Sequence, residues 1–421
     1  MNLETNIEKI RDEFPLLKVC TFLDAANQCI PNIRWMKVAH EYFDYQMTGR
    51  HDVAGHPFLS ARAQHSKIEA AKLINASVEE ICNMYRPSTG LNIVKDIIPW
   101  KKGDNVVCDD LGYPSSGHTW LQLRKKGVEI RRIKNSEGKI LLTGGSSIKE
   151  NIAPDCTSYG DLDQAIDEHT RLVCINRTTW TSGFTFDVEA VCKLAHEKGA
   201  LVVDDAFQSI GAIKVDVKKD NIDFLITGSY KWQCGPEGAG FFYVRKDLIN
   251  KYEPSFWSYG NIARPGEMGG SFGDPTHDNI TSYDFPLVQD ARRFDQGICV
   301  GEVLWAWDAT LQYLNELEPT NVEQRVKKLG GYCIDRLLDL GIKVNTPIDP
   351  EERHGLISYT LKNHDLNMKS YEALVRHRPI PINVSIRYQG GIGGIRICCH
   401  FFNTEEDIDK VIDVQKRILE D

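Results

Sequence analysis

Short apolar runs alternate with longer amphipathic stretches through residues 62–245. Runs of this kind, bounded by polar or glycine-rich segments, are typical of buried strands, whereas apolar residues spaced by three or four positions favour helices. The expected strands are 106–108, 128–133, 172–175, 201–203, 224–226 and 240–244. The expected helices of this part are 62–82, 117–126, 162–168 and 188–198. Because strands and helices alternate, we predict an α/β fold with a mostly parallel sheet covered on both faces.

The alternation stops after residue 250. Residues 250–297 are rich in glycine, proline, serine and aromatic residues, and a segment of that length is expected to cover a site or a partner surface. Helical spacing returns later, and both ends of the chain add further elements. These are helices at 1–18, 300–316, 321–340 and 404–419, and strands at 356–361 and 394–399. We therefore predict a large domain, 19–297, and a smaller domain, 298–421, joined by the N-terminal segment 1–18.

Composition excludes several classes of function. The chain has 421 residues and a net charge of −9, and its lysines and arginines are dispersed, so no basic face for nucleic acid is expected. No apolar run approaches the roughly 20 residues that cross a membrane, and the N-terminus lacks the pattern of a secretory signal. The 12 cysteines form no CxxC pair, so no metal site is expected. Many free thiols favour the cytoplasm.

Two reactive side chains follow two of the predicted strands. Asp205 follows the strand 201–203, and Lys231 follows the strand 224–226. The carboxyl ends of parallel strands meet at one edge of a sheet, where ligands bind. Pyridoxal phosphate requires both groups, a lysine for the Schiff base and a carboxylate for its ring nitrogen. Taken singly, Asp205 could cap a helix and Lys231 could be a surface lysine.

Sequence motifs around these two residues resemble the class V aminotransferase family. They are Asp205-Ala-Phe-Gln208, Ser229-Tyr-Lys231-Trp232, and a C-terminal signature that includes Arg396 and Asn403-Thr-Glu-Glu-Asp407. Similar segments near the N-terminus, around 103–115 and at 291–297, follow in the family's order, so the resemblance covers nearly the whole chain. The family includes cysteine desulfurases, selenocysteine lyases, kynureninases, C–S lyases and proteins similar to isopenicillin N epimerase.

The resemblance implies the fold and the assembly. Its members are fold-type I pyridoxal-phosphate enzymes, with a large domain built on a mostly parallel seven-stranded sheet and a smaller α+β C-terminal domain. Such enzymes are usually homodimers with active sites at the interface, and their substrate is an amino acid.

Roles for single residues follow from the resemblance. Lys231 matches the Schiff-base lysine, Asp205 the partner of the ring nitrogen, and Gln208 a donor to the ring oxygen, although Gln208 could also cap a turn. Arg396 matches the arginine that binds the substrate carboxylate, a bidentate task that suits guanidinium; a salt bridge at a strand end is the alternative. Ser88-Thr89-Gly90 matches the turn that binds the phosphate at the start of a helix, where free N–H groups favour an anion.

Three neighbouring positions complete the predicted cofactor site. Tyr113 stands where many members have a histidine that stacks on the ring, a task that a tyrosine face also performs, although Tyr-Pro-Ser could simply form a turn. Tyr230 and Ser229, next to the lysine, match residues that bind the phosphate.

The chain also departs from the family. Trp180 replaces an asparagine before the Gly183 turn, and Ile298 replaces a threonine that reaches the neighbouring subunit's phosphate. Desulfurases carry a nucleophilic cysteine before the carboxylate-binding arginine, and the corresponding segment 382–394 has none. Because persulfide formation needs a thiolate, a desulfurase is disfavoured.

We therefore predict a pyridoxal-phosphate enzyme that acts at Cα or Cβ of an amino acid. An aminotransferase is favoured narrowly over a β-eliminating C–S lyase, with an epimerase less favoured and a non-catalytic cofactor-binding protein as the alternative outside enzymes. His51 and His56 lie in a loop that could contact the substrate side chain or be solvated. His118, close to Tyr113, is a similar candidate.

Overall fold

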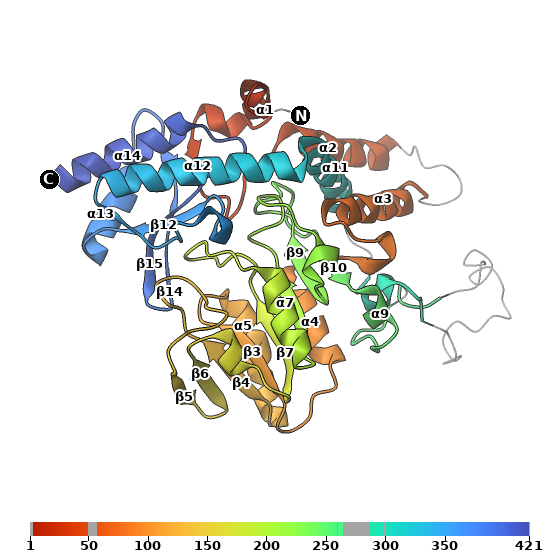
Figure 1. The fold of residues 1–421 in the computed structure, drawn as a ribbon. Coiled ribbons are helices and arrows are strands. Elements are labelled where there is room, and N and C mark those ends of the chain that lie inside the picture. Colours follow the sequence, from red (N-terminus) through yellow and green to blue (C-terminus); the bar gives the residue numbers. More distant parts are fainter. Residues whose placement is uncertain (1–2, 49–56, 259, 264–286, 298–299, 421) are drawn as a thin grey trace.

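Two sheets with their helices form the computed structural model of the chain (Figure 1). The structure describes residues 3–48, 57–258, 260–263, 287–297 and 300–420. His51 and His56 lie outside these residues. The large sheet occupies the lower part of the view in Figure 1, and the second sheet lies above it, between the large sheet and helices α12 and α14.

The large sheet has nine strands in the order β2-β10-β9-β8-β7-β3-β4-β6-β5. The strands from β9 to β6 run parallel, whereas β2, β10 and β5 pair antiparallel with their neighbours. Their bounds are Ile81–Met84 (β2), Asn105–Asp109 (β3), Glu129–Ile133 (β4), Lys149–Ala153 (β5), Cys156–Tyr159 (β6), Thr170–Ile175 (β7), Leu201–Asp205 (β8), Phe224–Gly228 (β9) and Gly240–Val244 (β10). The mostly parallel α/β sheet is confirmed.

Two strands exceed the seven that were expected. Strands β6 and β5 continue the sheet beyond β4, and β5 is an edge strand whose five residues are all exposed. A solvated edge strand needs no apolar run, so the pattern of hydrophobic residues gave no signal for β5.

Helices cover the faces of this sheet and begin or end close to the predicted positions. Their bounds are Pro57–Leu73 (α3), Pro87–Ile97 (α4), Pro114–Leu121 (α5), Leu162–Ala165 (α6), Val188–Glu197 (α7), Val217–Asp220 (α8) and Lys246–Ile249 (α9). The helix predicted at 62–82 ends early, because Asn75 adopts a left-handed conformation (φ 57°) and the chain then enters β2. The helix predicted at 117–126 splits into α5 and the 3-10 helix Gln122–Lys126, which Gly127 ends with φ 74°. The helix predicted at 1–18 is the short α1, Ile7–Asp12, followed by the 3-10 turn Pro15–Lys18.

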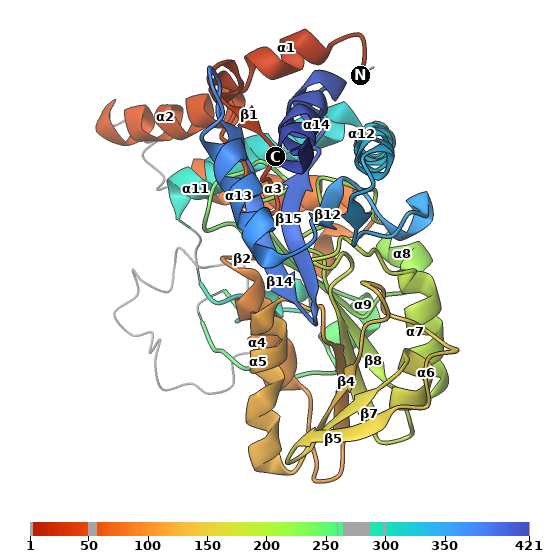
Figure 2. The same cartoon turned by 90° about the vertical axis from the view of Figure 1, so that its left-hand side faces the viewer.

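The second sheet is antiparallel and has the order β11-β12-β15-β14. Its strands are Lys343–Val344, Leu356–Thr360, Ser385–Gln389 (β14) and Ile392–Cys398 (β15). Three helices lie near it in Figure 2: Pro319–Asp339 (α12), His364–Val375 (α13) and Glu405–Glu420 (α14). The N-terminal segment joins this part of the fold, since β1 (Thr21–Phe22) pairs in parallel with β13 (Ile382–Asn383).

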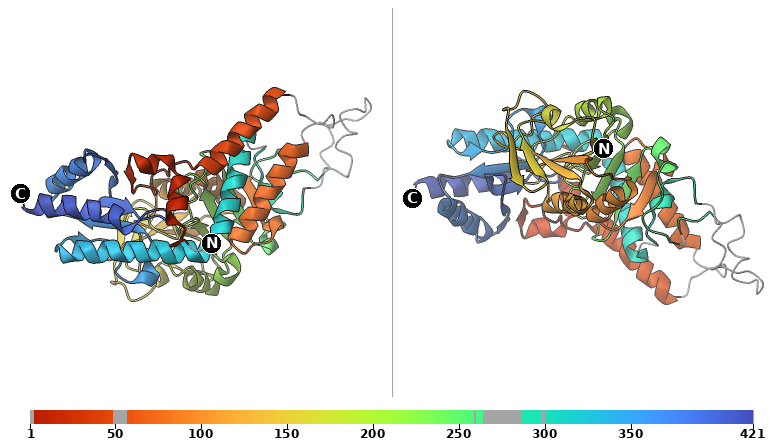
Figure 3. Two further views of the ribbon diagram at one scale, coloured as in Figure 1. Left: turned by 90° about the horizontal axis from the view of Figure 1, so that it is seen from above. Right: turned by 90° about the horizontal axis from the view of Figure 1, so that it is seen from below.

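Helices α2 (Ile33–Thr48) and α11 (Gly301–Leu317) lie with α3 at the end of the molecule opposite the C-terminus (Figure 3). Helix α11 packs against both of the others. Trp307 and Leu311 of α11 belong to the same apolar core as the large sheet. The domain boundary at 297/298 stays a prediction.

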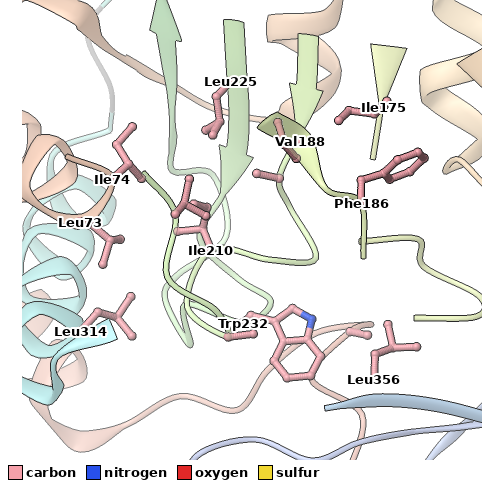
Figure 4. Close-up of a cluster of buried hydrophobic side chains, with 14 of the residues drawn as sticks. Leu73, Ile74, Ile175, Phe186, Val188, Ile210, Leu225, Trp232, Leu314 and Leu356 are labelled. Atoms are coloured by element: carbon pink, nitrogen blue, oxygen red, sulfur yellow. The ribbon is translucent and has the colours of Figure 1, made fainter. Parts of the chain in front are cut away.

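Trp232 connects the apolar core of the large sheet to the second sheet. Its ring is fully buried and lies between Ile210, at one side of the large sheet's core, and Leu356 of β12 (Figure 4). The residue before Trp232 is Lys231, so the lysine stands where the two parts of the fold meet. None of the described helices is both long enough and apolar enough to pass through a lipid bilayer.

Candidate active site

A cavity of about 400 Å³ opens at the carboxyl edge of the parallel strands. Its walls come from the ends of β8 and β9, the segment after β7, and the starts of α4 and α5. The lining residues are Arg86, Pro87, Ser88, Tyr113, Ser115, Asn176, Thr178, Trp180, Asp205, Phe207, Gln208, Tyr230, Lys231, Glu237 and Gly238. This is the edge at which ligands bind in open α/β sheets.

Lys231 is buried in this cavity. Its Nζ lies 4.2 Å from the centroid of the Phe207 ring and 5.3 Å from that of the Tyr113 ring. Burial lowers the pKa of Lys231, and the positive charge of Arg396 lowers it further, while Asp205 opposes both effects. A lowered pKa raises the fraction of neutral amine, which is the form that attacks an aldehyde.

Asp205 is the last residue of β8 and lines the same cavity. Its carboxylate accepts hydrogen bonds from the Phe207 N–H at 3.2 Å and from the Ser116 hydroxyl at 3.3 Å. No described helix begins at Asp205, so the alternative role as a helix cap is wrong. Burial raises its pKa and the charge of Lys231 counteracts that rise. The pair expected from the two strand ends is therefore brought to one cavity.

Gln208 also lines the cavity, and its amide is held from both sides. Nε2 donates to the Ala26 carbonyl at 3.0 Å, and Oε1 accepts from the Trp232 indole N–H at 2.9 Å. One amide hydrogen of Gln208 remains for a ligand. The rings of Tyr230 and Phe207 pack edge to face at 4.9 Å, which fixes Tyr230 in the wall.

The start of helix α4 has the features of an anion site. Pro87 occupies its first turn, no side chain caps it, and Arg86 adds a cation to the cavity wall. Ser88 lines the cavity, whereas Thr89 and Gly90 do not. Free N–H groups and the dipole of this 11-residue helix favour a phosphate.

Gly90 and Ser229 have structural partners instead. A Cβ at Gly90 would come within 2.8 Å of the Met84 side chain and 3.0 Å of Ile226, so glycine lets α4 approach the sheet. The Ser229 hydroxyl donates to the Pro236 carbonyl. Roles for Thr89, Gly90 and Ser229 as phosphate ligands stay predictions.

Tyr113 and Trp180 form one wall of the cavity. Their rings meet edge to face with centroids 5.5 Å apart, and the Tyr113 N–H donates to the Asn176 side chain at 3.0 Å. The indole N–H of Trp180 is buried without a hydrogen-bond partner among the described residues. A buried donor of this kind is costly unless a ligand accepts from it.

Arg396 does not line the cavity. Its guanidinium is buried and donates to the Trp180 carbonyl at 2.9 Å and to the Ser385 hydroxyl at 3.1 Å, and it pairs with Asp24 at 3.3 Å. The salt bridge that was its alternative role is therefore present, and binding of a substrate carboxylate stays a prediction. His118 of α5 is exposed and does not line the cavity either.

The sequence analysis missed several lining residues. They are Arg86, Ser115, Asn176, Thr178, Phe207 and Glu237. Asn176 directly follows β7, so the argument from strand ends that selected Asp205 would also have selected it. The others follow from the path of the chain after a strand or before a helix, for which the local pattern gave no signal.

No thiol lines the cavity among the described residues. Each of the described cysteines is buried and free, and the loop between β14 and β15 contains none. The arrangement offers an amine with a lowered pKa, a buried carboxylate and an anion site. Pyridoxal phosphate fits these groups: Lys231 would hold its aldehyde carbon, Asp205 its ring nitrogen and the start of α4 its phosphate, and bound there it supplies an electron sink.

Comparisons with known proteins agree with this geometry. The family model for aminotransferase class-V matches residues 31–411. A probable cysteine desulfurase of Methanothermobacter thermautotrophicus is 28% identical over 95% of each chain, and the uncharacterized aminotransferase YcbU of Bacillus subtilis is 23% identical over 96% of each.

Solved structures share the fold. The apo structure of a cysteine desulfurase from Thermococcus onnurineus superposes with a TM-score of 0.80 at 21% identity over 98% of each chain. The cystine C–S lyase C-DES, in complex with cysteine persulfide, reaches a TM-score of 0.78 at 20% identity over 96% of this chain and 98% of its own. With the family model spanning most of its length, the chain belongs to the class V aminotransferase family and is a pyridoxal-phosphate-dependent enzyme.

Proposed function

We propose that this enzyme cleaves the C–S bond of a sulfur-containing amino acid by β-elimination. The observation that carries the proposal is a cavity with a base and a cofactor site and without a thiol. A desulfurase passes sulfur to a cysteine thiolate, and none of the described cysteines reaches this cavity. Without an acceptor in the enzyme, sulfur leaves with the departing group.

The substrate class follows from the relatives. Several are named as cysteine desulfurases, and one structural neighbour is a cystine C–S lyase. We infer that the substrate is cysteine or a derivative such as cystine, in which the sulfur is bonded to Cβ. The departing group is then a thiol, a persulfide or sulfide.

The residues divide the reaction between them. Lys231, with its lowered pKa, takes the proton from Cα of the bound amino acid. Asp205 maintains the protonation of the ring nitrogen, which strengthens the electron sink. Arg396 is the cation for the substrate α-carboxylate, which must first compete with Asp24 for the guanidinium.

Transamination is the second candidate. The family and the relative YcbU carry the aminotransferase name, and Lys231 would take the same Cα proton in that reaction. The two functions differ in where the proton and the β-substituent go afterwards.

A substrate panel distinguishes the candidates. The purified enzyme is incubated with cysteine, cystine, alanine and glutamate, and the products are quantified by mass spectrometry. We expect pyruvate and ammonia from cystine or cysteine and none from the Lys231→Ala variant. Pyridoxamine phosphate with a keto acid would replace the lyase by an aminotransferase, and alanine with a protein persulfide would show a desulfurase.

We also propose that the enzyme acts as a homodimer in the cytoplasm. Dimers are usual for this fold, which is an argument by analogy. Free buried thiols suit a reducing compartment. Light scattering of the active enzyme tests the assembly, and an active monomer would contradict it.

A further inference from the structure

Cys29 and Cys234 lie against each other beside the lysine of the active site. Their Sγ atoms are 3.2 Å apart, although 205 positions separate the residues along the chain. Cys29 belongs to the irregular segment between β1 and α2, and Cys234 belongs to the turn that follows Lys231. The two sulfurs would have to approach by about 1.2 Å to reach the length of a disulfide, about 2.05 Å.

Both cysteines are attached to the residues of the site. The Cys29 N–H donates to the Tyr230 carbonyl at 2.8 Å, and the Cys234 N–H donates to the Lys231 carbonyl at 2.9 Å. Cys234 has a left-handed backbone (φ 57°), which is unusual for a residue other than glycine. The segment before Cys29 also borders the cavity, since the Gln28 side chain donates to Glu237 at 2.7 Å. A shift of either sulfur is therefore transmitted to Lys231.

A thiol pair is a better account of this cluster than a metal site. His400 Nε2 lies 3.5 Å from Cys234 Sγ, so the three donor atoms are close enough for an ion. Nε2, however, lies 2.9 Å from the Trp232 carbonyl, and Nδ1 accepts the Phe401 N–H at 2.8 Å. A carbonyl only accepts, so Nε2 carries the proton and directs no lone pair at the sulfurs.

We propose that Cys29 and Cys234 form a reversible disulfide by exchange with low-molecular-weight disulfides, and that this bond slows the enzyme by moving the turn that carries Lys231. Cys29, which retains 8% exposure, attacks one sulfur of the small disulfide and releases one thiol. Cys234 then attacks the mixed disulfide and releases the second thiol. The two cysteine protons leave on the two released thiols, so no other oxidant is needed.

Loss of activity follows from the geometry. Reacting groups must keep their positions closely, and a displacement of about 1 Å can cost roughly a hundredfold in rate. Because the Lys231 carbonyl accepts the Cys234 N–H, the closing bond draws on the lysine's own backbone. We expect at least a tenfold loss of turnover in the oxidised enzyme and recovery with dithiothreitol.

The test uses the holoenzyme and oxidised glutathione. After incubation and alkylation, a non-reducing tryptic digest should contain one cross-linked pair, residues 19–34 with 232–245. The pair should be absent from Cys29→Ser and present in Cys20→Ser. Cys20 is the matched control, because it is equally buried and lies in the same peptide as Cys29. The visible band of the Lys231 Schiff base should shift on oxidation in wild type and Cys20→Ser, and not in Cys29→Ser.

Two results would overturn the proposal. One is the absence of the cross-link, or cross-linking of the more deeply buried neighbours Cys333 and Cys399 to the same extent. The other is a complete cross-link with an unchanged Schiff-base band and unchanged turnover. The cross-link and the band need no C–S cleavage, so their failure is distinguishable from failure of the proposed lyase reaction.

Discussion

Arg396 and Asp24 form an ion pair inside the protein, with Nη2 of the arginine 3.3 Å from Oδ1 of the aspartate. Their side chains are 1% and 8% exposed, so neither charge has water as an alternative partner. The pair joins β15 to the segment that follows β1, across 372 positions of the chain. The substrate carboxylate and the fold therefore depend on the same guanidinium.

Asp24→Asn should lower the free energy of unfolding by about 3 kcal/mol, because removing one partner of a buried pair leaves the other charge uncompensated. Denaturant unfolding measures the change. Asp12→Asn is the control, since Asp12 pairs with Lys18 at the same 3.3 Å on the surface, where both side chains are mostly exposed. Equal effects of the two variants would show that burial does not strengthen the Arg396 pair.

Lys231→Ala should abolish both turnover and the adduct that borohydride fixes between the cofactor and the protein. The amine of Lys231 is the group that lines the cavity beside Asp205. Mass spectrometry of the reduced protein detects the adduct and its position. Lys67→Ala is the matched control, because burial also lowers the pKa of Lys67 and that residue does not line the cavity. An adduct that persists in Lys231→Ala would show that the assignment is wrong.

The reaction of the apoenzyme with pyridoxal phosphate should depend on pH near neutrality. Burial, followed by the charge of Arg396, lowers the pKa of Lys231 to about 7. A lowered pKa places the neutral amine above that pH, so the rate of Schiff-base formation should rise between pH 6 and 8, about one pH step on either side, and then level off. Stopped-flow absorbance follows the rate. A rate that keeps rising towards pH 10.5, the ordinary value for lysine, would contradict the shift.

Asp205→Asn should reduce kcat at least a hundredfold, about 2.7 kcal/mol in activation free energy. The amide cannot hold a proton on the ring nitrogen, so the electron sink is weakened. Ser116→Ala removes only a long hydrogen bond of 3.3 Å to the same carboxylate and should cost less than about fivefold, roughly 1 kcal/mol. Steady-state kinetics on the best substrate of the panel compare the two variants. A comparable loss in both would assign the effect to the position of Asp205 and not to its charge.

The sequence predicted the chemical centre of the site better than its outer parts. Asp205 and Lys231 follow short apolar strands, and parallel strands place such residues at one edge, so the pattern alone located them. Asn176 follows β7 in the same way. The neighbourhood of Arg396 could not be predicted, because its partner Asp24 is remote in sequence and local spacing does not register a contact of that kind.

Packing of α4 on the sheet is a second feature that only the structure shows. The Ser88-Thr89-Gly90 turn was expected to bind phosphate with all three residues, and only Ser88 lines the cavity. Gly90 faces Met84 and Ile226 instead. Its lack of a side chain serves the distance between helix and sheet, which sets where the start of the helix lies.

Gly90→Ala should therefore weaken both stability and cofactor binding. The new Cβ would lie 2.8 Å from Met84 Cε and 3.0 Å from Ile226, so α4 must move away from the sheet, at a cost of about 1–3 kcal/mol. The start of α4 moves with it, and we expect the dissociation constant for pyridoxal phosphate to rise about tenfold, or 1.4 kcal/mol. Gly117→Ala in α5 is the control, because nothing lies within 4 Å of a Cβ there and alanine favours a helix. Thermal unfolding of the apoenzyme and cofactor titration measure the two effects, and a Gly90→Ala enzyme as stable as Gly117→Ala, with unchanged affinity, would refute the close approach of helix and sheet.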